Sequence, residues 1–300
     1  MSNTLARYLL LGFGVFMGST AVILIKACGE NPMLIAAYRL LIAAATLTPL
    51  FLRERQQYDR PYGWRQLSWS ALPGLLLAVH FITWNIGVHL TRVSNASLIV
   101  NTTPAVMPFF LWLVFRERVT RMEAVGTLVA LAGLGLLALS RMKINAAGLR
   151  GDLICLVSML CYAAYLALGR RNSNRLPLWL YMVPLYLIAS LTCLLCALPF
   201  VNPIKSYTAR DLLLILALGI VPTVGGHTIL NYSMKHLRGQ VVSIAGMGQI
   251  LFATMMGYLV FREIPETAFY PTAALIVTGV WITLTSGYRR RAAATKLEAA

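Results

Sequence analysis

The sequence has 300 residues, of which 58% are hydrophobic and 12% are charged, and its mean hydropathy is +0.71. Soluble globular chains carry about 25% charged residues, so this composition excludes an ordinary soluble domain and predicts an all-α membrane protein. The net charge of +16 would indicate a nucleic-acid partner in a soluble protein. Here 25 of the 26 Lys and Arg residues lie between or at the ends of apolar runs, where they face lipid headgroups, so no nucleic acid is expected.

Ten apolar runs of roughly 18 to 22 residues follow one another along the chain, each long enough to cross a bilayer as a helix. They lie near residues 8–27, 32–52, 70–89, 94–115, 122–140, 151–169, 177–200, 211–232, 239–260 and 268–287. Most connections between them are very short, which makes sequential helices antiparallel neighbours. The longest connection is expected at 53–69.

The distribution of basic residues predicts the orientation in the membrane. With the N-terminus inside, 17 Lys and Arg residues lie on the cytoplasmic side and 8 on the opposite side. Because the retained side of a membrane protein carries the excess of positive charge, both termini are predicted to be cytoplasmic. The short loops favour the bacterial inner membrane as the location of this multi-pass protein.

An internal repeat divides the chain into two similar halves. The segment Leu113-Val114-Phe115-Arg116-Glu117 recurs unchanged at 259–263, which is an offset of 146 residues. The same offset pairs Asn85 with Asn231 and Gly133 with Gly279, so the chain is a duplicated five-helix unit. Because five is an odd number of crossings, the second copy enters the membrane from the other side and the repeat is inverted. The expected units are 1–146 and 147–300.

The repeated segments resemble the EamA-type exporters of the drug/metabolite transporter superfamily. The likeness rests on a small-residue fourth helix that leads from Val93 through Pro104 to the Phe-Arg-Glu end at Glu117, and on its second copy at 239–263. The second copy has Gln249-Ile250-Leu251 where the first has Thr103-Pro104-Ala105. The resemblance implies a central cavity lined by the first, third and fourth helices of each repeat, and a function in exporting amino acids or related metabolites.

Polar and aromatic side chains within the spans are the candidates for a substrate site, because a polar group near the bilayer centre is costly unless it pairs or faces a cavity. In such a pocket aromatic faces would take the apolar part of a solute, while Asn, Gln and His side chains bind its polar groups. The alternative role for these residues is interhelical hydrogen bonding. The candidates are His80, Trp84, Asn85, Asn101, Tyr162, Tyr165, His227, Asn231 and Gln249.

Arg39 is the one basic residue well inside a span. It lies about seven residues from the start of its apolar run, so we expect it to reach the outer interface and pair with Glu30 or another outer polar group. A role in binding a substrate carboxylate is the less favoured alternative. All ten acidic residues lie at span ends or in loops. Transport is therefore expected either to be facilitated diffusion or to be coupled through His80 or His227.

These observations predict a transporter of small molecules. No catalytic motif is found, so an enzyme is not expected, and neither a metal site nor a cofactor is predicted. The five cysteines lie mostly inside apolar helices and indicate no disulfide framework. Neutral amides and aromatic groups outnumber fixed charges in the spans, which favours a neutral or zwitterionic substrate. Amino acids are the first candidates, and other amphipathic metabolites or drugs the alternative.

Overall fold

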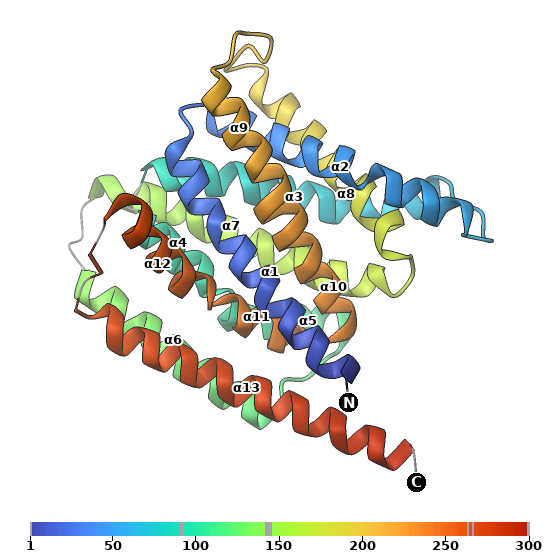
Figure 1. Ribbon diagram of the computed structural model, residues 1–300, viewed down its shortest axis with the longest axis vertical. Helices are drawn as coiled ribbons and strands as arrows, with labels where there is room; N and C mark the ends of the chain where they lie inside the picture. Colours follow the sequence, from blue (N-terminus) through green and yellow to red (C-terminus); the bar gives the residue numbers. More distant parts are fainter. Residues whose placement is uncertain (1, 91–92, 142–145, 263, 266, 299–300) are drawn as a thin grey trace.

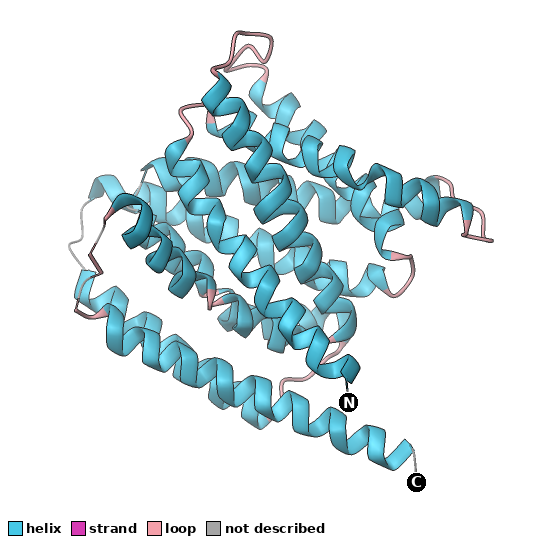
Figure 2. Ribbon diagram, in the orientation of Figure 1, coloured by secondary structure: helices cyan, strands magenta, loops and turns pink. Residues whose placement is uncertain are grey.

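The computed structural model describes residues 2–90, 93–141, 146–262, 264–265 and 267–298, and the ordered elements in these ranges are all helices (Figure 2). Ten helical spans among them are long and apolar enough to cross a membrane, which confirms the predicted all-α fold of ten spans. The first five spans are α1 (Ser2–Ala27), α2 (Pro32–Gln56), α3 (Trp64–Leu90), the pair α4 (Val93–Asn101) and α5 (Thr103–Phe115), and α6 (Arg121–Arg141). The second five are α7 (Ala146–Ser173), α8 (Leu178–Ala197), the composite of α9 (Ala209–Leu218), η1 (Gly219–Thr228) and α10 (Ile229–His236), the pair α11 (Gly239–Gly246) and α12 (Gln249–Phe261), and α13 (Phe269–Glu298).

Several helices extend beyond the apolar runs that predicted them. α1 begins at Ser2, α3 begins at Trp64 and α13 continues to Glu298. An apolar run marks only the part of a helix inside the hydrocarbon, and the helix can continue through the headgroup region. The prediction that 53–69 is the longest connection is therefore wrong, because α2 and α3 leave only residues 57–63 between them. Between the described helices, the connection at 198–208 is longer.

The fourth span of each repeat is broken at the same register. α5 begins at Thr103 and α12 begins at Gln249, which are 146 residues apart. In the first copy Pro104 lacks a backbone N–H, and the Thr103 hydroxyl donates to the Val100 carbonyl at 2.6 Å. In the second copy, without a proline, Gly248 N donates to the Ala245 carbonyl at 3.0 Å, which is the tighter spacing of a 3₁₀ turn. Both repeats therefore carry a joint at this depth.

The eighth span contains a π-helical segment, η1, in its middle. Pro222 lies within this segment and supplies no backbone N–H, while the Thr223 hydroxyl donates to the Leu218 carbonyl at 2.7 Å. π-Helical segments are rare and are frequent at functional sites. η1 also crosses α1 at a very short distance, since a Cβ atom on Gly226 would lie 2.9 Å from the Cα atom of Gly18.

The two repeats meet symmetrically where α6 and α13 pack side by side (Figure 1). Gly126 on α6 faces Gly279 on α13, and Gly133 on α6 accepts a hydrogen bond at 3.0 Å from the hydroxyl of Thr272. Residues 126 and 272 occupy one position of the repeat, and residues 133 and 279 occupy another. The two contacts are therefore related by exchange of the repeats, as expected for a pseudo-two-fold axis.

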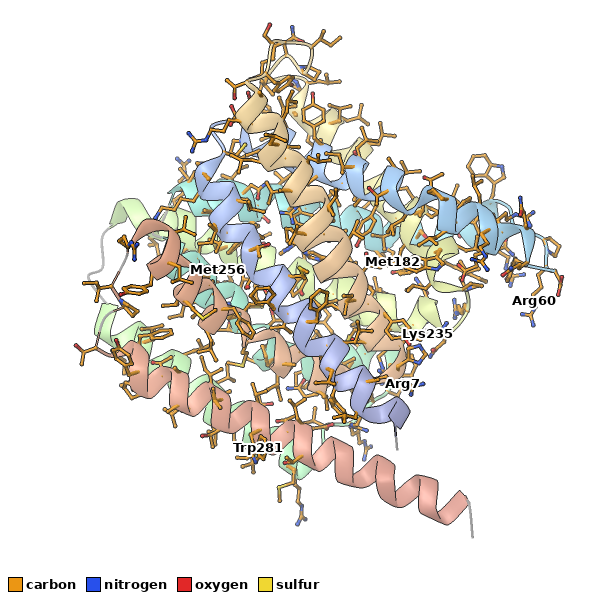
Figure 3. All side chains as sticks on the ribbon, viewed as in Figure 1. Arg7, Arg60, Met182, Lys235, Met256 and Trp281 are labelled. Atoms are coloured by element: carbon orange, nitrogen blue, oxygen red, sulfur yellow. The ribbon has the colours of Figure 1, made fainter. Side chains whose placement is uncertain are left out.

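The outer faces of the bundle are apolar. Trp281 on α13 projects away from the bundle and is 69% exposed (Figure 3). Such a side chain is placed for contact with lipid in a membrane protein. Both termini lie at one end of the bundle, toward which Arg7, Arg60 and Lys235 also lie (Figures 1 and 3). We call this end, where α1 begins and α13 ends, the terminal end.

Candidate functional site

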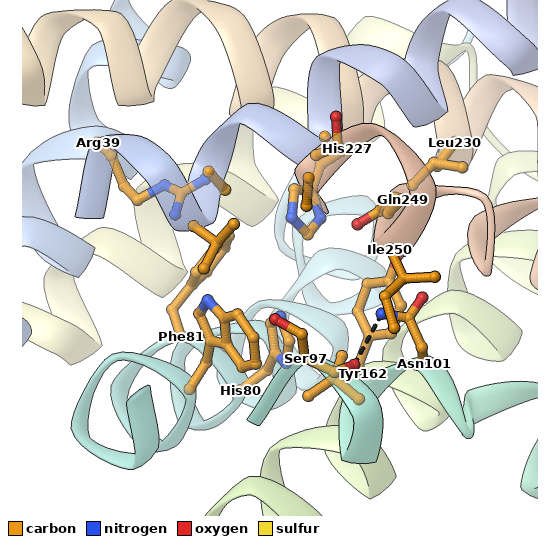
Figure 4. A pocket seen from close by; sticks show the side chains of 17 residues that line it. Arg39, His80, Phe81, Ser97, Asn101, Tyr162, His227, Leu230, Gln249 and Ile250 are labelled. Carbon is orange, nitrogen blue, oxygen red and sulfur yellow. Dashed lines mark hydrogen bonds between the residues drawn. The ribbon is translucent and has the colours of Figure 1, made fainter. Parts of the chain in front are cut away.

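A pocket with a cavity volume of about 80 Å³ lies between the two repeats (Figure 4). Its lining comes from α1, α3 and α4 of the first repeat and from α7, the η1–α10 span and α12 of the second, as the resemblance implied, and also from α2. The lining residues of α1 and α3 lie in the halves of these helices that are farther from the terminal end. The pocket therefore occupies the middle of the bundle and its opposite half.

Six of the nine side chains predicted for the site line this pocket. They are His80, Trp84, Asn101, Tyr162, His227 and Gln249. The sequence identified them only as polar or aromatic residues deep within apolar spans, and the fold brings them together from five different spans of the two repeats. The pocket thus combines hydrogen-bonding groups with aromatic faces, which is the composition of a small-molecule site.

Four aromatic rings form one wall of the pocket. His80 stacks on Tyr162 with ring centroids 4.8 Å apart and an interplanar angle of 27°. His227 lies 5.0 Å from Phe81 and 5.8 Å from Tyr162, with its ring nearly perpendicular to the tyrosine. These stacked and edge-on arrangements hold the rings in fixed orientations, so the wall offers preformed aromatic surface to a solute.

The two histidines differ in their hydrogen bonds. His80 Nδ1 lies 3.0 Å from the carbonyl oxygen of Ser158, and because a carbonyl can only accept, Nδ1 carries the proton. The Ser158 hydroxyl in turn donates to the His80 carbonyl at 3.0 Å. His227 Nδ1 has no hydrogen-bond partner within the described parts of the chain. His80 is thus held by its neighbour, while His227 retains a free hydrogen-bonding position beside the pocket.

The joints of the two broken spans supply the amide groups of the site. Asn101 ends α4 and donates to the carbonyl of Ser97 at 2.7 Å (Figure 4). Gln249 begins α12 and lies against Gly18, where a Cβ atom would come within 3.1 Å of the amide nitrogen. Gly18 therefore leaves the space that the Gln249 side chain occupies beside the pocket.

The remaining three predicted residues lie behind the pocket wall. Asn85 is buried and donates to the carbonyl of Pro32 at 2.8 Å. Asn231 donates to the hydroxyl of the buried Tyr165 and, at 2.8 Å, to the carbonyl of His227. None of the three is among the pocket-lining residues. In this structure they make hydrogen bonds within or between helices, which is the alternative role that the sequence left open.

Arg39 differs from the sequence-based expectation. The expected pairing with Glu30 is wrong, because Glu30 pairs with Lys205 at 2.6 Å and Arg39 is fully buried. The Arg39 side chain points inward from α2 and lines the pocket, where it faces His227 (Figure 4). Sequence position gives the depth of a residue in its span, but not the side of the helix that faces the bundle. One sequence signal could have identified Arg39. It is a basic residue within a span, and no span interior contains an acidic residue that could pair with it.

A second, smaller cavity of about 30 Å³ adjoins the pocket on the side of the terminal end. The two cavities share Asn101, Tyr162 and Gln249 as lining residues. The smaller cavity reaches Ser243 on α11, about one helical turn from the start of that helix at the terminal end. The two cavities thus lie next to each other, and the smaller one is nearer to the terminal end.

Four charged residues form ion pairs with one another at the terminal end of the bundle. The Arg170 guanidinium lies 2.8 Å from the Glu117 carboxylate, and that of Arg238 lies 3.6 Å from it. Arg238 also donates to Glu123, whose carboxylate accepts from the Thr120 backbone N–H at 2.8 Å. We call Glu117, Glu123, Arg170 and Arg238 the charge cluster. It joins the α5–α6 connection of the first repeat to α7 and the α10–α11 joint of the second.

The repeat does not duplicate the charge cluster at the opposite end. Phe269 occupies the repeat position of Glu123, and Leu24 occupies that of Arg170. Glu117 was expected to act in packing and capping at the end of its repeat, and the structure adds two ion pairs to that role. Its repeat partner Glu263 lies outside the described residues. Two charges of the cluster, those of Glu123 and Arg170, therefore have no charged counterpart in the other repeat.

Comparison with known proteins agrees with this architecture. The model of the EamA-like transporter family matches residues 5–139 and 149–285. One solved crystal structure superposes on this chain with a TM-score of 0.78 and 20% sequence identity. The superposition covers 95% of this chain and 99% of the chain in that structure. At this identity the likeness concerns the fold alone. Among curated proteins no significant match is found.

Proposed function

Since the chain belongs to the EamA-like transporter family, which is part of the drug/metabolite transporter superfamily, we propose that it exports amino acids or related small neutral or zwitterionic metabolites by alternating access. The observation that carries this proposal is the pocket between the two repeats. It combines an aromatic wall with amide and imidazole groups near mid-depth, where a carrier binds its solute. The described lining contains one guanidinium, that of Arg39, and no carboxylate, which suits a zwitterionic solute.

The positions of the cavities and of the charge cluster support alternating access. The pocket extends into the half of the bundle away from the terminal end, whereas the charge cluster closes the terminal end. Exchange of the two repeats by their pseudo-symmetry would open the terminal end and close the other. The joints at Thr102 and Gly248, and the π-helical segment η1, are the places where spans can bend in such an exchange.

We further propose that the protein lies in the bacterial inner membrane with both termini in the cytoplasm. The excess of Lys and Arg on the side of the termini supports this orientation. The charge cluster then forms the cytoplasmic closure, and the conformation described here corresponds to an outward-facing carrier. Reporter fusions at the C-terminus that are active only in the periplasm would contradict this orientation.

The test of the transport function is uptake of a panel of labelled amino acids into liposomes that contain the purified protein. Saturable uptake by the wild type is expected to fall by roughly tenfold or more in His227→Ala, because this ring contributes both wall surface and a hydrogen-bonding position. His89→Ala is the matched control, since His89 is exposed at the end of α3 and does not line the pocket. Failure to take up any amino acid, with uptake of other metabolites or drugs, would favour the alternative substrate class.

The same vesicles distinguish facilitated diffusion from proton coupling. Among the described lining residues His80 and His227 are the two imidazoles, the side-chain type whose unperturbed pKa is nearest to neutral pH. Facilitated diffusion predicts that an imposed pH gradient changes neither the rate nor the final level of uptake. Uphill accumulation that depends on the gradient, and that is lost in His80→Ala, would instead establish coupling through this histidine.

A further inference from the structure

Arg39 brings an unpaired guanidinium into the pocket. The side chain is 0% exposed and lies among the pocket-lining residues. Its Nε atom donates to the Thr223 hydroxyl at 2.9 Å, but its two terminal nitrogens, Nη1 and Nη2, have no hydrogen-bond partner within the described chain. A guanidinium has five N–H donors and no acceptor, so most of its donors are left for a group that is not part of the protein.

No carboxylate of the described chain neutralises this charge. Glu30, the acid expected as a partner, pairs with Lys205, and the ion pairs found in the described ranges do not include Arg39. An isolated charge removed from water is strongly destabilising unless it is paired and hydrogen-bonded. The charge of Arg39 is therefore left for an anion that is not part of the described chain, and charges interact more strongly where water is excluded.

The guanidinium is held in a fixed orientation by two contacts. Its carbon atom lies 4.3 Å from the centroid of the Phe81 ring, in a cation–π contact. Its Nε atom is fixed by Thr223, whose hydroxyl donates to the Leu218 carbonyl within the π-helical region. The free edge formed by Nη1 and Nη2 is therefore presented in a defined direction. A planar pair of donors held in this way matches the two oxygens of a carboxylate.

We infer that Arg39 binds the carboxylate of the transported solute and selects for carboxylate-bearing compounds. The inference rests on the proposed transport function and defines its substrate class more narrowly. With the carboxylate at Arg39, the remainder of the solute lies along the wall of His80, Phe81, Tyr162 and His227. The ammonium group of an amino acid can lie against these aromatic faces. Amino acids and simple carboxylic acids share the group that Arg39 recognises.

The experiment uses matched sets of three compounds: an amino acid, its amide, which lacks the carboxylate, and its deaminated acid, which lacks the ammonium group. Uptake into liposomes and the midpoint of thermal unfolding in detergent are measured for each compound. The amino acid and the deaminated acid are expected to be taken up or to raise the midpoint, and the amide to do neither. Preference for the amino acid over the deaminated acid identifies the zwitterion as the substrate, and the reverse identifies the simple acid.

Three variants test the role of the residue itself. Arg39→Met is expected to raise KM for carboxylates by at least about thirtyfold. Arg39→Lys keeps the charge but not the planar pair of donors, so it is expected to have an intermediate KM. Arg60→Met is the matched control, because Arg60 is exposed in the connection between α2 and α3. In the absence of solute, Arg39→Met is expected to unfold at the same or a higher temperature than the wild type, because it removes an uncompensated buried charge.

The outcomes separate this inference from the proposed function. Equal effects of the amide and the acid, or an unchanged KM in Arg39→Met, would overturn the inference while leaving transport established. Stabilisation by chloride alone, with no further effect of carboxylates, would also overturn it. Carboxylates that raise the unfolding midpoint of the wild type but not of Arg39→Met, without uptake of any compound, would support the anion site and overturn the transport function.

Discussion

Arg116 and Arg262 occupy the same position of the two repeats and share the same unusual backbone, a left-handed conformation with φ of 56°. Each follows the last residue of a helix, α5 or α12, and its backbone N–H donates to carbonyls of the last turn. Within the described chain these are the two non-glycine residues with positive φ. The identical Phe-Arg-Glu sequences therefore end their helices in the same way at opposite ends of the bundle.

Glycine at these two positions is expected to preserve or raise stability. An L-residue in the left-handed region costs about 1–2 kcal/mol relative to glycine, so Arg116→Gly or Arg262→Gly should raise the free energy of unfolding by up to about 1 kcal/mol. Arg53→Gly is the control, because Arg53 lies within α2 and glycine there should cost about 1 kcal/mol. Thermal unfolding in detergent measures all three. Equal destabilisation at residues 53 and 116 would contradict the assigned backbone conformation.

Breaking the charge cluster is expected to open the terminal end. Arg238→Gln removes the contacts to Glu117 and Glu123 and leaves both carboxylates partly unpaired. The reporter is Ser243→Cys in a protein that lacks the native cysteines, because Ser243 lines the smaller cavity, on the side of the terminal end. Its modification by a charged thiol reagent should become roughly fivefold to thirtyfold faster, which corresponds to about 1–2 kcal/mol.

Lys205→Gln is the control for this experiment. It removes the Lys205–Glu30 ion pair at the opposite end of the bundle and leaves the charge cluster intact. Modification of the introduced cysteine is expected to keep the rate of the parent protein or to fall below it. A rate that rises equally in both variants would indicate general loosening of the bundle rather than opening of one end.

The crossing of α1 and η1 is expected to tolerate no side chain at residue 226. A Cβ atom there would lie 2.9 Å from the Cα and 3.0 Å from the backbone nitrogen of Gly18, and backbone atoms cannot rotate away. Gly226→Ala should therefore lower the free energy of unfolding by about 1–3 kcal/mol. Gly135→Ala in α6 is the matched control, since its Cβ would meet no atom within 4 Å. An unfolding midpoint that is lowered equally in both variants would contradict this close approach.

Thr223 is expected to act as a positioning residue for Arg39. Thr223→Val keeps the shape of the side chain but removes the hydroxyl that accepts from Arg39 Nε. Loss of a hydrogen bond to a charged group should raise KM for carboxylates about tenfold to a hundredfold, with a smaller effect on kcat. Thr223→Ser should restore the wild-type KM, because it keeps the hydroxyl. A Ser variant as impaired as the Val variant would assign Thr223 to packing instead.

The spans and their duplication could be predicted from the sequence because both depend on local properties of the chain. The length of an apolar run matches the thickness of the hydrocarbon core, so each run predicts a span. The identical segments at 113–117 and 259–263 indicate the duplication. The break before α12 could not be predicted in the same way. No proline marks it, and the backbone there turns through Met247 and Gly248, whose N–H groups donate to the carbonyls three residues earlier.

The site could be predicted in part, because the chemistry of a side chain and its depth are local properties whereas its direction is not. His80 and Asn85 both lie deep in α3, yet His80 lines the pocket and Asn85 bonds to the start of α2. Asn231 occupies the repeat position of Asn85 and also lies behind the wall. The direction in which the Arg39 side chain points is fixed by its hydrogen bond to Thr223, in a π-helical segment more than 180 residues away in the sequence.

The contact between α6 and α13 has the form of an interface between two copies of one subunit. Gly126 meets Gly279 and Gly133 meets Thr272, so each half presents the same patch of its last helix to the other half. Such a self-complementary patch can hold two separate molecules together without a covalent link. If the chain is divided between α6 and α7 and its halves are produced as separate polypeptides, they are therefore expected to associate in the membrane. Two smaller proteins would have associated in the same way before their genes were joined.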